Sequence, residues 1–380
     1  MHFQPLTAPV IIGGGPAGTA AAIRLARAGQ APILLERNAE PTDKVCGDFL
    51  GADAISLLLD LGIEPASLGA ASIQRVRVVH RQQVAETSLP FAALSLSRRM
   101  LDAALLQRAR AVGADVHRGT GVRRLSRGEA GWHLDTSAGP LNASTVFLAT
   151  GKHDMRDHPR PGTHTGAVGM KTYLRLAPRQ TAALAGSTEL YLFPGGYAGL
   201  QPVEDGKVVL CAALRHGRFR HWTELIDLLT AATPLLRDRL AGAEVLLARP
   251  LAVAGIPYGM LQRHAGHAAL FRLGDQAAVI PSLTGDGIAI ALHSGSLAAR
   301  CWLDRQDAET YQRRLADGLA GQMLLATTLH TLAINGVLQP TALRAVSLFP
   351  PILQWFAAAT RIRRPLVQQS SPATGGLHPA

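Results

Sequence analysis

The stretch VIIGGGPAG, residues 10–18, decides the fold of this chain. It joins a short apolar run to an alanine-rich amphipathic segment, and a second apolar run follows at residues 31–35. This order predicts a β-α-β unit of the Rossmann type. In such a unit Gly13 permits the tight turn, Gly15 lets the backbone approach a pyrophosphate, and Gly18 lets the helix pack closely on the strand.

An acidic residue ends the second apolar run. Glu36 lies eighteen residues after Gly18, where a carboxylate can accept hydrogen bonds from a ribose diol. Pro16 and Ala17 open the helix, whose free N–H groups would face the phosphates. Arg37 follows at once, but the acid before it argues against a 2′-phosphate. The whole unit therefore predicts a dinucleotide-binding domain.

A second glycine-rich element, LGDQAAVIPSLTGDGI, stands at residues 273–288. It resembles the second FAD fingerprint of the geranylgeranyl reductase family, within the superfamily of para-hydroxybenzoate hydroxylase-like flavoproteins, and so implies FAD rather than NAD. Asp275 follows an apolar run and can accept from a ribityl hydroxyl, and the glycine pair near 286 opens a helix whose dipole can stabilise a reduced flavin. The FAD ligands expected here are Gly274, Asp275, Gly285, Asp286, Gly287 and Ile288.

Three further segments resemble the same family: SRRMLD at 97–102, FLATG at 147–151 and KVCG at 44–47. The resemblance implies that the first lies near the FAD pyrophosphate, with Asp102 as a structural partner. It implies that the second passes the adenosine side and that the third borders the flavin. The additional FAD ligands expected from these segments are Arg98, Ala149, Thr150, Gly151, Lys44, Cys46 and Gly47.

Three residues are candidates for catalysis: Cys46, Tyr197 and His293. Cys46 is either a reactive thiol beside the flavin or a small buried side chain, and both interpretations stay open. His293 lies on the helix that would face the flavin, although a packed core histidine is the more common role at such spacing.

Tyr197 begins the stretch YAGLQP, residues 197–202, where isoprenoid-reducing relatives carry Tyr-x-Trp-x-Phe-Pro. Gly199 and Gln201 stand in place of the two aromatic residues. We expect this exchange to enlarge the substrate wall and make it more polar, which argues against a plain polyprenyl chain as the substrate.

The composition is that of a globular protein, with 47% hydrophobic and 17% charged residues among 380. The net charge is +11, but the basic residues are scattered, so no nucleic acid partner is predicted. The three cysteines favour a reducing compartment, and the fourteen histidines show no metal-binding spacing, so no metal is expected. The chain shows no signal peptide and is expected to be cytoplasmic, with peripheral membrane contact as a further possibility.

The expected fold class is α/β, as an α+β composite: a Rossmann-like FAD-binding domain with a three-layer ββα arrangement, an interleaved antiparallel-sheet substrate domain, and C-terminal helices. Apolar stripes at 321–360 favour a core or dimer surface over a membrane anchor, although Arg361 to Arg364 beside Trp355 would suit an anionic lipid surface. The oligomeric state is open. The expected boundaries are 1–70, 96–154 and 268–305 for the FAD-binding domain, 71–95 and 155–267 for the substrate domain, 306–368 for the helical region and 369–380 for a disordered tail.

The leading functional hypothesis is an FAD-dependent oxidoreductase that reduces a carbon–carbon double bond in a lipophilic small molecule. The alternatives are an FAD-dependent monooxygenase that hydroxylates a phenolic or polyketide-like substrate, and a flavin electron carrier. The sequence has no second Gly-x-Gly-x-x-Gly for a separate nicotinamide domain. NAD(P)H or a reduced electron-carrier protein is therefore expected to act as a transient donor.

Overall fold

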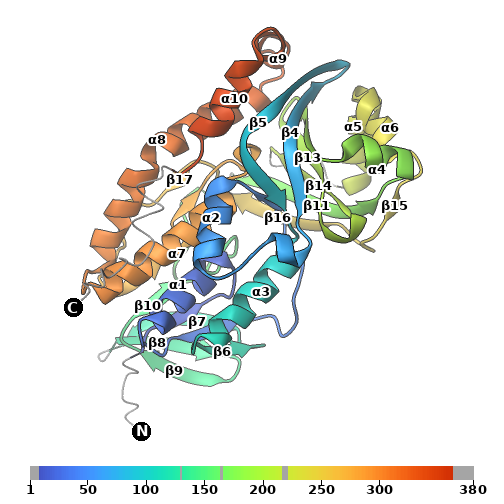
Figure 1. Cartoon of the computed structure of the whole chain (residues 1–380). Helices are drawn as coiled ribbons and strands as arrows, with labels where there is room; N and C mark the ends of the chain where they lie inside the picture. The colour runs from blue at the N-terminus through green and yellow to red at the C-terminus, as the bar shows by residue number, and fades with distance from the viewer. Residues whose placement is uncertain (1–7, 129–130, 163–165, 216–220, 363–380) are drawn as a thin grey trace, which may run out of the picture.

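A computed structural model of the chain describes residues 8–128, 131–162, 166–215 and 221–362 (Figure 1). Its first sheet is parallel and has five strands in the order β18-β10-β1-β2-β6. The strands are short, and side chains on both faces are mostly buried except in the edge strand β6, where only Val116 is buried. They are β1 (Val10–Ile12), β2 (Ile33–Glu36), β6 (Asp115–Arg118), β10 (Val146–Leu148) and β18 (Leu270–Arg272).

Alternate side chains of this sheet enter two different cores. Ile11 packs with the helical layer, whereas Val10 and Ile12 pack with a small three-stranded sheet. Because both faces are covered, β1, β2, β10 and β18 are mostly apolar without alternation, as buried parallel strands require, whereas the edge strand β6 alternates. This arrangement confirms the expected three-layer ββα class. The helices are α1 (Pro16–Arg27), α2 (Ala52–Asp60), α3 (Arg98–Ala111) and α7 (Gly287–Leu303), and the small sheet is β7 (Val122–Gly128), β8 (Gly131–Thr136) and β9 (Gly139–Ala143).

The second large sheet has nine strands, ordered β15-β11-β14-β13-β12-β4-β5-β3, with β16 paired to β11. All pairs are antiparallel except β12 with β4, which confirms the interleaved antiparallel sheet of the expected fold class. The strands are β3 (Phe49–Leu50), β4 (Ala71–His80), β5 (Gln83–Ser95), β11 (Ala167–Arg175), β12 (Ser187–Phe193), β13 (Gly196–Pro202), β14 (Val208–Leu214), β15 (Glu244–Val245) and β16 (Leu251–Ile256).

Three helices pack beside this sheet: α4 (Pro178–Leu184), α5 (Trp222–Ala232) and α6 (Pro234–Leu240). The sequence predicts one helix in this region, near residues 222–230, which corresponds to α5. The prediction of only one helix is wrong, because α4 and α6 are also present. Each of them has seven residues and begins with proline, so neither is long enough to show helical periodicity and each resembles a break between strands.

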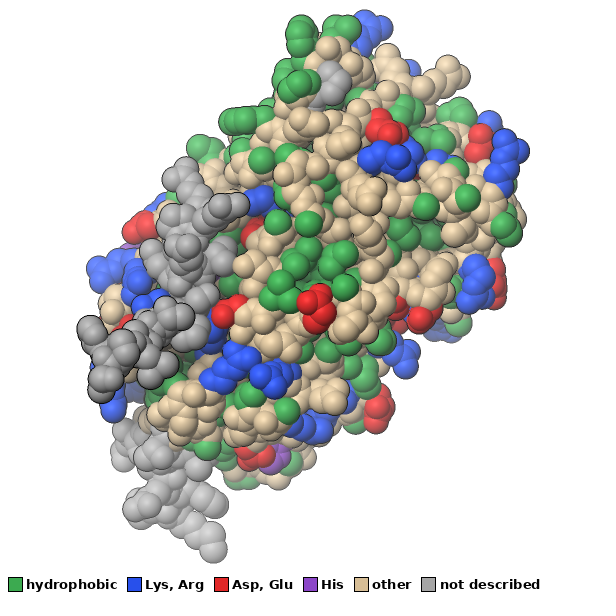
Figure 2. All heavy atoms as spheres, viewed as in Figure 1, with side chains coloured by type: hydrophobic (Ala, Val, Ile, Leu, Met, Phe, Trp, Pro, Cys, Tyr) green, Lys and Arg blue, Asp and Glu red, His purple; other side chains and the backbone are tan. Residues whose placement is uncertain are grey.

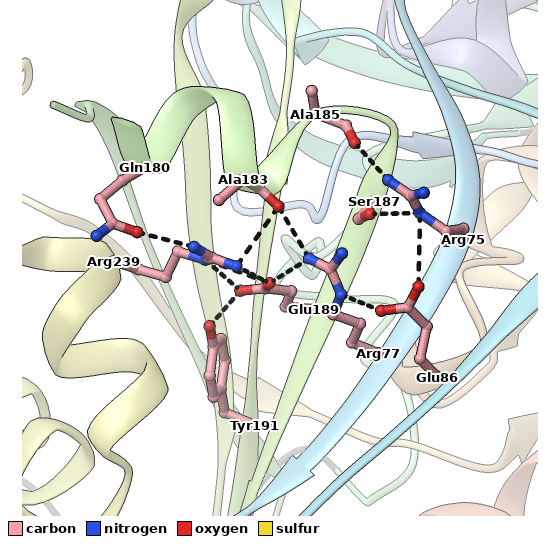
Figure 3. A network of polar contacts seen from close by, with 10 residues as sticks. All are labelled: Arg75, Arg77, Glu86, Gln180, Ala183, Ala185, Ser187, Glu189, Tyr191 and Arg239. Atoms are coloured by element: carbon pink, nitrogen blue, oxygen red, sulfur yellow. Dashed lines mark hydrogen bonds and ion pairs between the residues drawn. The ribbon is translucent and has the colours of Figure 1, made fainter. Parts of the chain in front are cut away.

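A buried ion network fastens these helices to the sheet (Figure 3). Glu189 on β12 is fully buried and accepts hydrogen bonds from Arg77 on β4, from Arg239 on α6 and from Tyr191. Arg239 also donates to Gln180 on α4 at 2.7 Å. The network is satisfied by partners from two helices and two strands, so it specifies how α4 and α6 sit on the sheet.

The remaining chain is helical and runs along the other side of the molecule (Figure 1). It consists of α8 (Ala308–Ile334), α9 (Gln339–Leu348) and α10 (Pro350–Ala359). A two-stranded sheet, β17 (Met260–Leu261) with β19 (Ala278–Val279), lies before α7 in the sequence. The expected tail at 369–380 lies outside the described residues, and the domain boundaries stay a prediction.

The network yields a test of stability. Glu189→Ala leaves the buried Arg239 without its carboxylate, so we expect the free energy of unfolding to fall by about 3–5 kcal/mol. Glu86→Ala is the matched control: it removes a 41% exposed partner of Arg77 and is expected to cost less than about 1 kcal/mol. Denaturant unfolding measures both.

The same experiment has a pH dependence. Burial raises the pKa of Glu189, but its bonds to Arg239, Tyr191 and Arg77 outweigh burial, so the net shift is downward. A carboxyl with a lowered folded pKa stabilises the protein above its unfolded pKa and loses that contribution as the pH falls. Equal losses for the two variants at neutral pH would contradict the assignment.

Candidate functional site

A continuous cavity of about 930 Å³ lies between the two large sheets and extends to the C-terminal helices. Its lining comes from segments far apart in sequence, including β1, the loop after β2, β12, β13 and the start of α7. Most of the expected FAD ligands line it. They are Gly13, Gly15, Pro16, Ala17, Glu36, Arg37, Lys44, Cys46, Gly47, Arg98, Ala149, Thr150, Gly151, Gly274, Asp275, Gly285, Gly287 and Ile288.

The first glycine turn has the shape of a phosphate cradle. Gly13 has φ +110°, and a Cβ there would overlap the carbonyl oxygen of Ala149. A Cβ at Gly18 would overlap the carbonyl oxygen of Gly13, so Gly18 serves the helix-to-strand contact and does not line the cavity. Gly15 is different: its Cβ would face the cavity and meet only Arg98, at 3.3 Å. The open side at Gly15 is where a pyrophosphate can approach the helix N-terminus.

Glu36 stands beside this turn and is 6% exposed. One of its carboxylate oxygens accepts from the Gly14 N–H at 2.7 Å, and the other accepts from Asn38. Sequence reasoning assigned Glu36 to a ribose alone and missed that it also holds the glycine turn. The oxygen that faces Asn38 accepts two bonds, from its backbone N–H and from its side-chain amide, whereas the oxygen that faces Gly14 accepts one and keeps a lone pair for a ribose hydroxyl.

Two cationic side chains that line the cavity, Arg98 and Lys44, are both bound to the Asp102 carboxylate. Arg98 donates to both oxygens of Asp102 at 2.9 Å, and the Lys44 ammonium lies 2.9 Å from the same group. Burial would raise the pKa of Asp102, but Arg98 and Lys44 outweigh it and lower that pKa. The two cations are thereby held where a pyrophosphate or ribityl chain would pass, and Asp102 acts as the structural partner that the resemblance implied.

The second glycine element also lines the cavity, with Gly274 close to Ala17 at the start of α1. Gly274 has φ +56° and Gly285 has φ +76°, a conformation that favours glycine. Asp275 pairs with Lys152 at 3.3 Å, and both line the cavity. Burial would lower the pKa of Lys152, but Asp275 raises it. Lys152 is a cavity residue that sequence reasoning missed, because the segment around it matches no flavoprotein motif.

Asp286 does not line the cavity. It is fully buried and pairs with Arg361, at the end of α10, at 2.7 Å. Burial raises the pKa of Asp286 to about 7, against the opposing effect of Arg361. Its expected role as a direct FAD ligand is therefore corrected, since the carboxylate faces the C-terminal helix. Arg361 itself lines the cavity.

A buried triad supports the loop that carries Cys46. Asp48 is fully buried with φ +60°, and its Oδ2 accepts from the Lys171 ammonium at 2.6 Å and from the Tyr173 hydroxyl at 2.7 Å. Lys171 also donates to the Lys44 carbonyl at 3.2 Å. Burial raises the pKa of Asp48 against the opposing effect of Lys171. Sequence reasoning missed this triad, although a lysine within the strand-like run AVGMKTYLR was a signal for it.

The wall that departs from the family motif differs from our expectation. Gln201 is 4% exposed, and its amide nitrogen donates to the Gly47 carbonyl at 2.8 Å and to the Ser95 hydroxyl at 2.7 Å. The amide hydrogens are thus used to hold the Cys46–Gly47 loop. Gly199 adds space but no polar group. Gln201 does line the cavity, as expected, but its amide hydrogens are used and the neighbouring lining is apolar: Val76, Val78, Leu190 and Leu192. The expectation of a more polar wall is therefore corrected in part.

Tyr197 belongs to a hydrogen-bonded group at the centre of the cavity. The Ser282 hydroxyl lies 2.7 Å from the hydroxyls of both Tyr197 and Tyr258, and all three residues line the cavity. The His330 ring packs edge-on against both tyrosines. Burial raises the pKa of Tyr197 well above its ordinary value and lowers the pKa of His330 to about 4. At neutral pH the phenols therefore keep their protons, and the histidine is uncharged.

The structure does not bring His293 to the cavity. It is 1% exposed on α7, it is absent from the lining, and burial lowers its pKa to about 4. Its environment fits the packed core histidine that the sequence favoured. Within the described ranges, no three His, Cys, Asp or Glu side chains are grouped to hold a metal ion.

Comparison with known proteins agrees with this geometry. Residues 7–138 match the family described as FAD binding domain. The menaquinone reductase of Mycobacterium tuberculosis (strain H37Rv) is 28% identical over 338 residues, which cover 81% of this chain and 79% of that protein. Digeranylgeranylglycerophospholipid reductase 2 of Methanopyrus kandleri is 27% identical, over 76% of this chain and 75% of its own length.

Two solved structures share the fold. Halogenase PltM superposes with a TM-score of 0.71 at 16% identity, covering 96% of this chain and 88% of that one. A geranylgeranyl bacteriochlorophyll reductase-like protein from Thermoplasma acidophilum has a TM-score of 0.70 at 17% identity, covering 96% and 95%.

The glycine cradle, the two cations and the family match define the class: the chain is an FAD-dependent oxidoreductase. The FAD binding domain match covers residues 7–138. Beyond that segment, the chain resembles a digeranylgeranylglycerophospholipid reductase over 76% of its length, in agreement with the resemblance carried by the two glycine-rich elements.

The cradle can be tested at Gly15, whose φ of −78° any residue can adopt. We expect Gly15→Val to fold normally but to weaken FAD binding by about tenfold or more, because the side chain fills the approach of the pyrophosphate. Titration of the apoprotein with FAD, followed by flavin fluorescence, measures the affinity.

Gly321→Ala is the control, because its added Cβ meets no atom within 4 Å. It is expected to bind FAD as the wild type does. Unchanged affinity in Gly15→Val would show that the pyrophosphate lies elsewhere.

Proposed function

We propose that this protein reduces a carbon–carbon double bond in a long lipophilic molecule of the isoprenoid-bearing kind. The observation that carries the proposal is the continuity of the cavity. One end has the glycine cradle at Gly13 and Gly15, and the other is lined by apolar side chains of α8, α9 and α10. A single space therefore connects a dinucleotide site to a binding site suited to an apolar chain.

The names of the relatives agree with a substrate of this kind. Menaquinone and digeranylgeranylglycerophospholipid are the molecules named for proteins that this chain resembles along most of its length. The apolar lining around Val78, Leu190 and Leu192 supports the same class, since Gln201 does not present its amide hydrogens to the cavity.

Reduction of a double bond adds a hydride to one carbon and a proton to the other. FAD, when reduced, supplies the hydride. The glycine turns, Arg98 and Lys44 hold the cofactor, while the apolar walls orient the substrate and exclude water. We propose that the Tyr197 hydroxyl holds the proton, with Ser282 and Tyr258 connected to it by hydrogen bonds.

We propose that NAD(P)H or a reduced carrier protein delivers electrons by transient binding. The support is that the Gly-x-Gly-x-x-Gly of the sequence occurs once, at residues 13–18, and is assigned to FAD. Stopped-flow reduction of the bound flavin by each donor distinguishes the two.

The central experiment follows flavin absorbance without oxygen. We expect menaquinone in detergent micelles, or geranylgeranyl diphosphate, to re-oxidise the reduced protein, with the saturated product detected by mass spectrometry. Substrate-stimulated oxygen uptake with a phenol such as phloroglucinol, and no anaerobic reaction, would support a monooxygenase instead. If neither reaction is observed, the hypothesis of a flavin electron carrier is favoured.

The proton-holding group predicts a specific loss of rate. Tyr197→Phe removes the hydroxyl but keeps the ring, so we expect kcat to fall by about 10²–10⁴-fold with little change in KM. Reduction of the flavin by its donor should be unaffected. Tyr191→Phe is the control and is expected to keep the wild-type kcat. Tyr191 lies on the face of the sheet that points away from the cavity, where its hydroxyl donates to Glu189.

The pH profile provides an independent check. Since burial raises the pKa of Tyr197, the phenol stays protonated, and kcat should not fall between about pH 6 and pH 9. A Tyr197→Phe enzyme with wild-type kcat would exclude Tyr197 as the proton holder.

A further inference from the structure

The helical corner formed by α9 and α10, residues 339–359, is fastened at both of its ends. At the start of α9, Gln339 donates to the Phe193 carbonyl at 2.9 Å. After the end of α10, Arg361 pairs with Asp286 at 2.7 Å, and the Ile362 N–H donates to Asp53 at 3.0 Å. Between these anchors the chain bends by 107° and projects at one end of the molecule (Figure 1).

The inner side of the corner is part of the cavity wall. Leu343 and Val346 of α9 and Leu353 and Phe356 of α10 all line the cavity. Leu343 is buried, and the other three are partly buried, so this side of the corner faces the protein interior.

The outer side of the corner is apolar and exposed. Leu348 is 75% exposed, Phe349 61% and Trp355 60%. Val337 and Leu338, just before α9, are exposed as well. Figure 2 shows hydrophobic side chains gathered at this end, over α9 and α10. Adjacent exposed side chains of this size mark a surface that another apolar phase covers.

The charge of this region indicates which kind of apolar phase covers the corner. Asp317 is the last acidic residue of the sequence, and the 63 residues from 318 to 380 contain four arginines and no Asp, Glu or Lys. Arg344 lies on the exposed part of α9, next to the apolar face. Arg361 is paired with Asp286, and Arg363 and Arg364 lie outside the described residues, so Arg344 is the basic residue placed on the face. An apolar face that carries a basic residue, on helices without Asp or Glu, is suited to an anionic lipid surface.

The cavity reaches the surface at the same place. Ala345 and Ile352 both line the cavity and are exposed, so the corner borders an opening. A second copy of the chain packed on the corner would cover this opening. A bilayer would instead place the opening in contact with the phase that dissolves lipophilic molecules.

We propose that the helical corner inserts its outer side into one leaflet of an anionic membrane and that the substrate passes from that leaflet into the cavity beside it. The route rests on the proposed function, since it supplies the lipophilic substrate named there. No single helix in the described ranges is long and apolar enough to cross a bilayer, and only α9 and α10 together have the required length and composition. Because both ends of the corner are anchored to the protein body, it dips into the leaflet and does not span the membrane.

Binding is tested with the full FAD-loaded chain and phosphatidylcholine vesicles with or without phosphatidylglycerol. We expect co-sedimentation with the anionic vesicles, weakened by salt. The double variant Leu348→Ser, Phe349→Ser should bind about tenfold more weakly or worse. Val245→Ser is the matched control, because Val245 is 59% exposed on β15 and lies outside the corner. Equal binding of both variants, or no binding by the wild type, would overturn the proposal.

The insertion itself is tested through Trp355, one of four tryptophans. Brominated phosphatidylcholine quenches indoles that enter the acyl region, so we expect vesicles containing it to quench the protein and Trp355→Phe to abolish that quenching. Quenching that persists in the variant would place the contact elsewhere. The alternative occupant is a second copy of the chain. It would be assigned if the wild type dimerised without binding vesicles and the double variant were monomeric.

Failure of this proposal can be separated from failure of the proposed function. With geranylgeranyl diphosphate in buffer, the wild type and the double variant should turn over equally. With menaquinone in vesicles, the variant should lose most of its rate. If the wild type does not turn over in buffer, the proposed function is rejected. The vesicle-binding result is then judged independently of it.

Discussion

The close approach of Gly13 to the Ala149 carbonyl is the contact on which the remaining structure depends. It brings the turn after β1 against the end of β10, and Gly18 then brings α1 against the same turn. No side chain fits between these three backbone segments. The helix N-terminus is therefore held at the edge of the parallel sheet, so backbone packing prepares the anion site, and Arg98 and Lys44 add positive charge to it.

The loop of Cys46 is held to the nine-stranded sheet by polar contacts that the apolar cores alone would not provide. Asp48 follows Cys46, whereas its partners Lys171 and Tyr173 belong to β11. Gln201 holds the same loop from β13, which β14 separates from β11. On the opposite face of β12, Glu189 binds the helices that cover it. Charged groups thus position the walls, and the space that they enclose is largely apolar.

The sequence predicts well those features that depend on neighbours in the chain. The glycine turn, the strand that Glu36 ends and the α3 helix capped by Ser97 are encoded within short segments, so their roles could be inferred from spacing. Asp48 and Lys171 are 123 residues apart, and Tyr197 and Ser282 are 85 apart. Their contacts exist only once β11, β13 and the loop before α7 have met, and no local pattern encodes that meeting. Asp286 shows the converse: its motif is local, but its partner Arg361 decides which way the carboxylate turns.

The pairing of Asp286 with Arg361 has a consequence for how the two ends of the cavity respond to one another. Arg361 lines the cavity and is the counter-ion of Asp286, at the start of the helix that carries the second glycine element. The two residues stand 75 positions apart in the sequence, so one ion pair closes the segment after α10 onto that glycine element. Loss of either charge leaves the other buried without its partner. The cofactor end and the apolar end of the cavity are therefore energetically coupled.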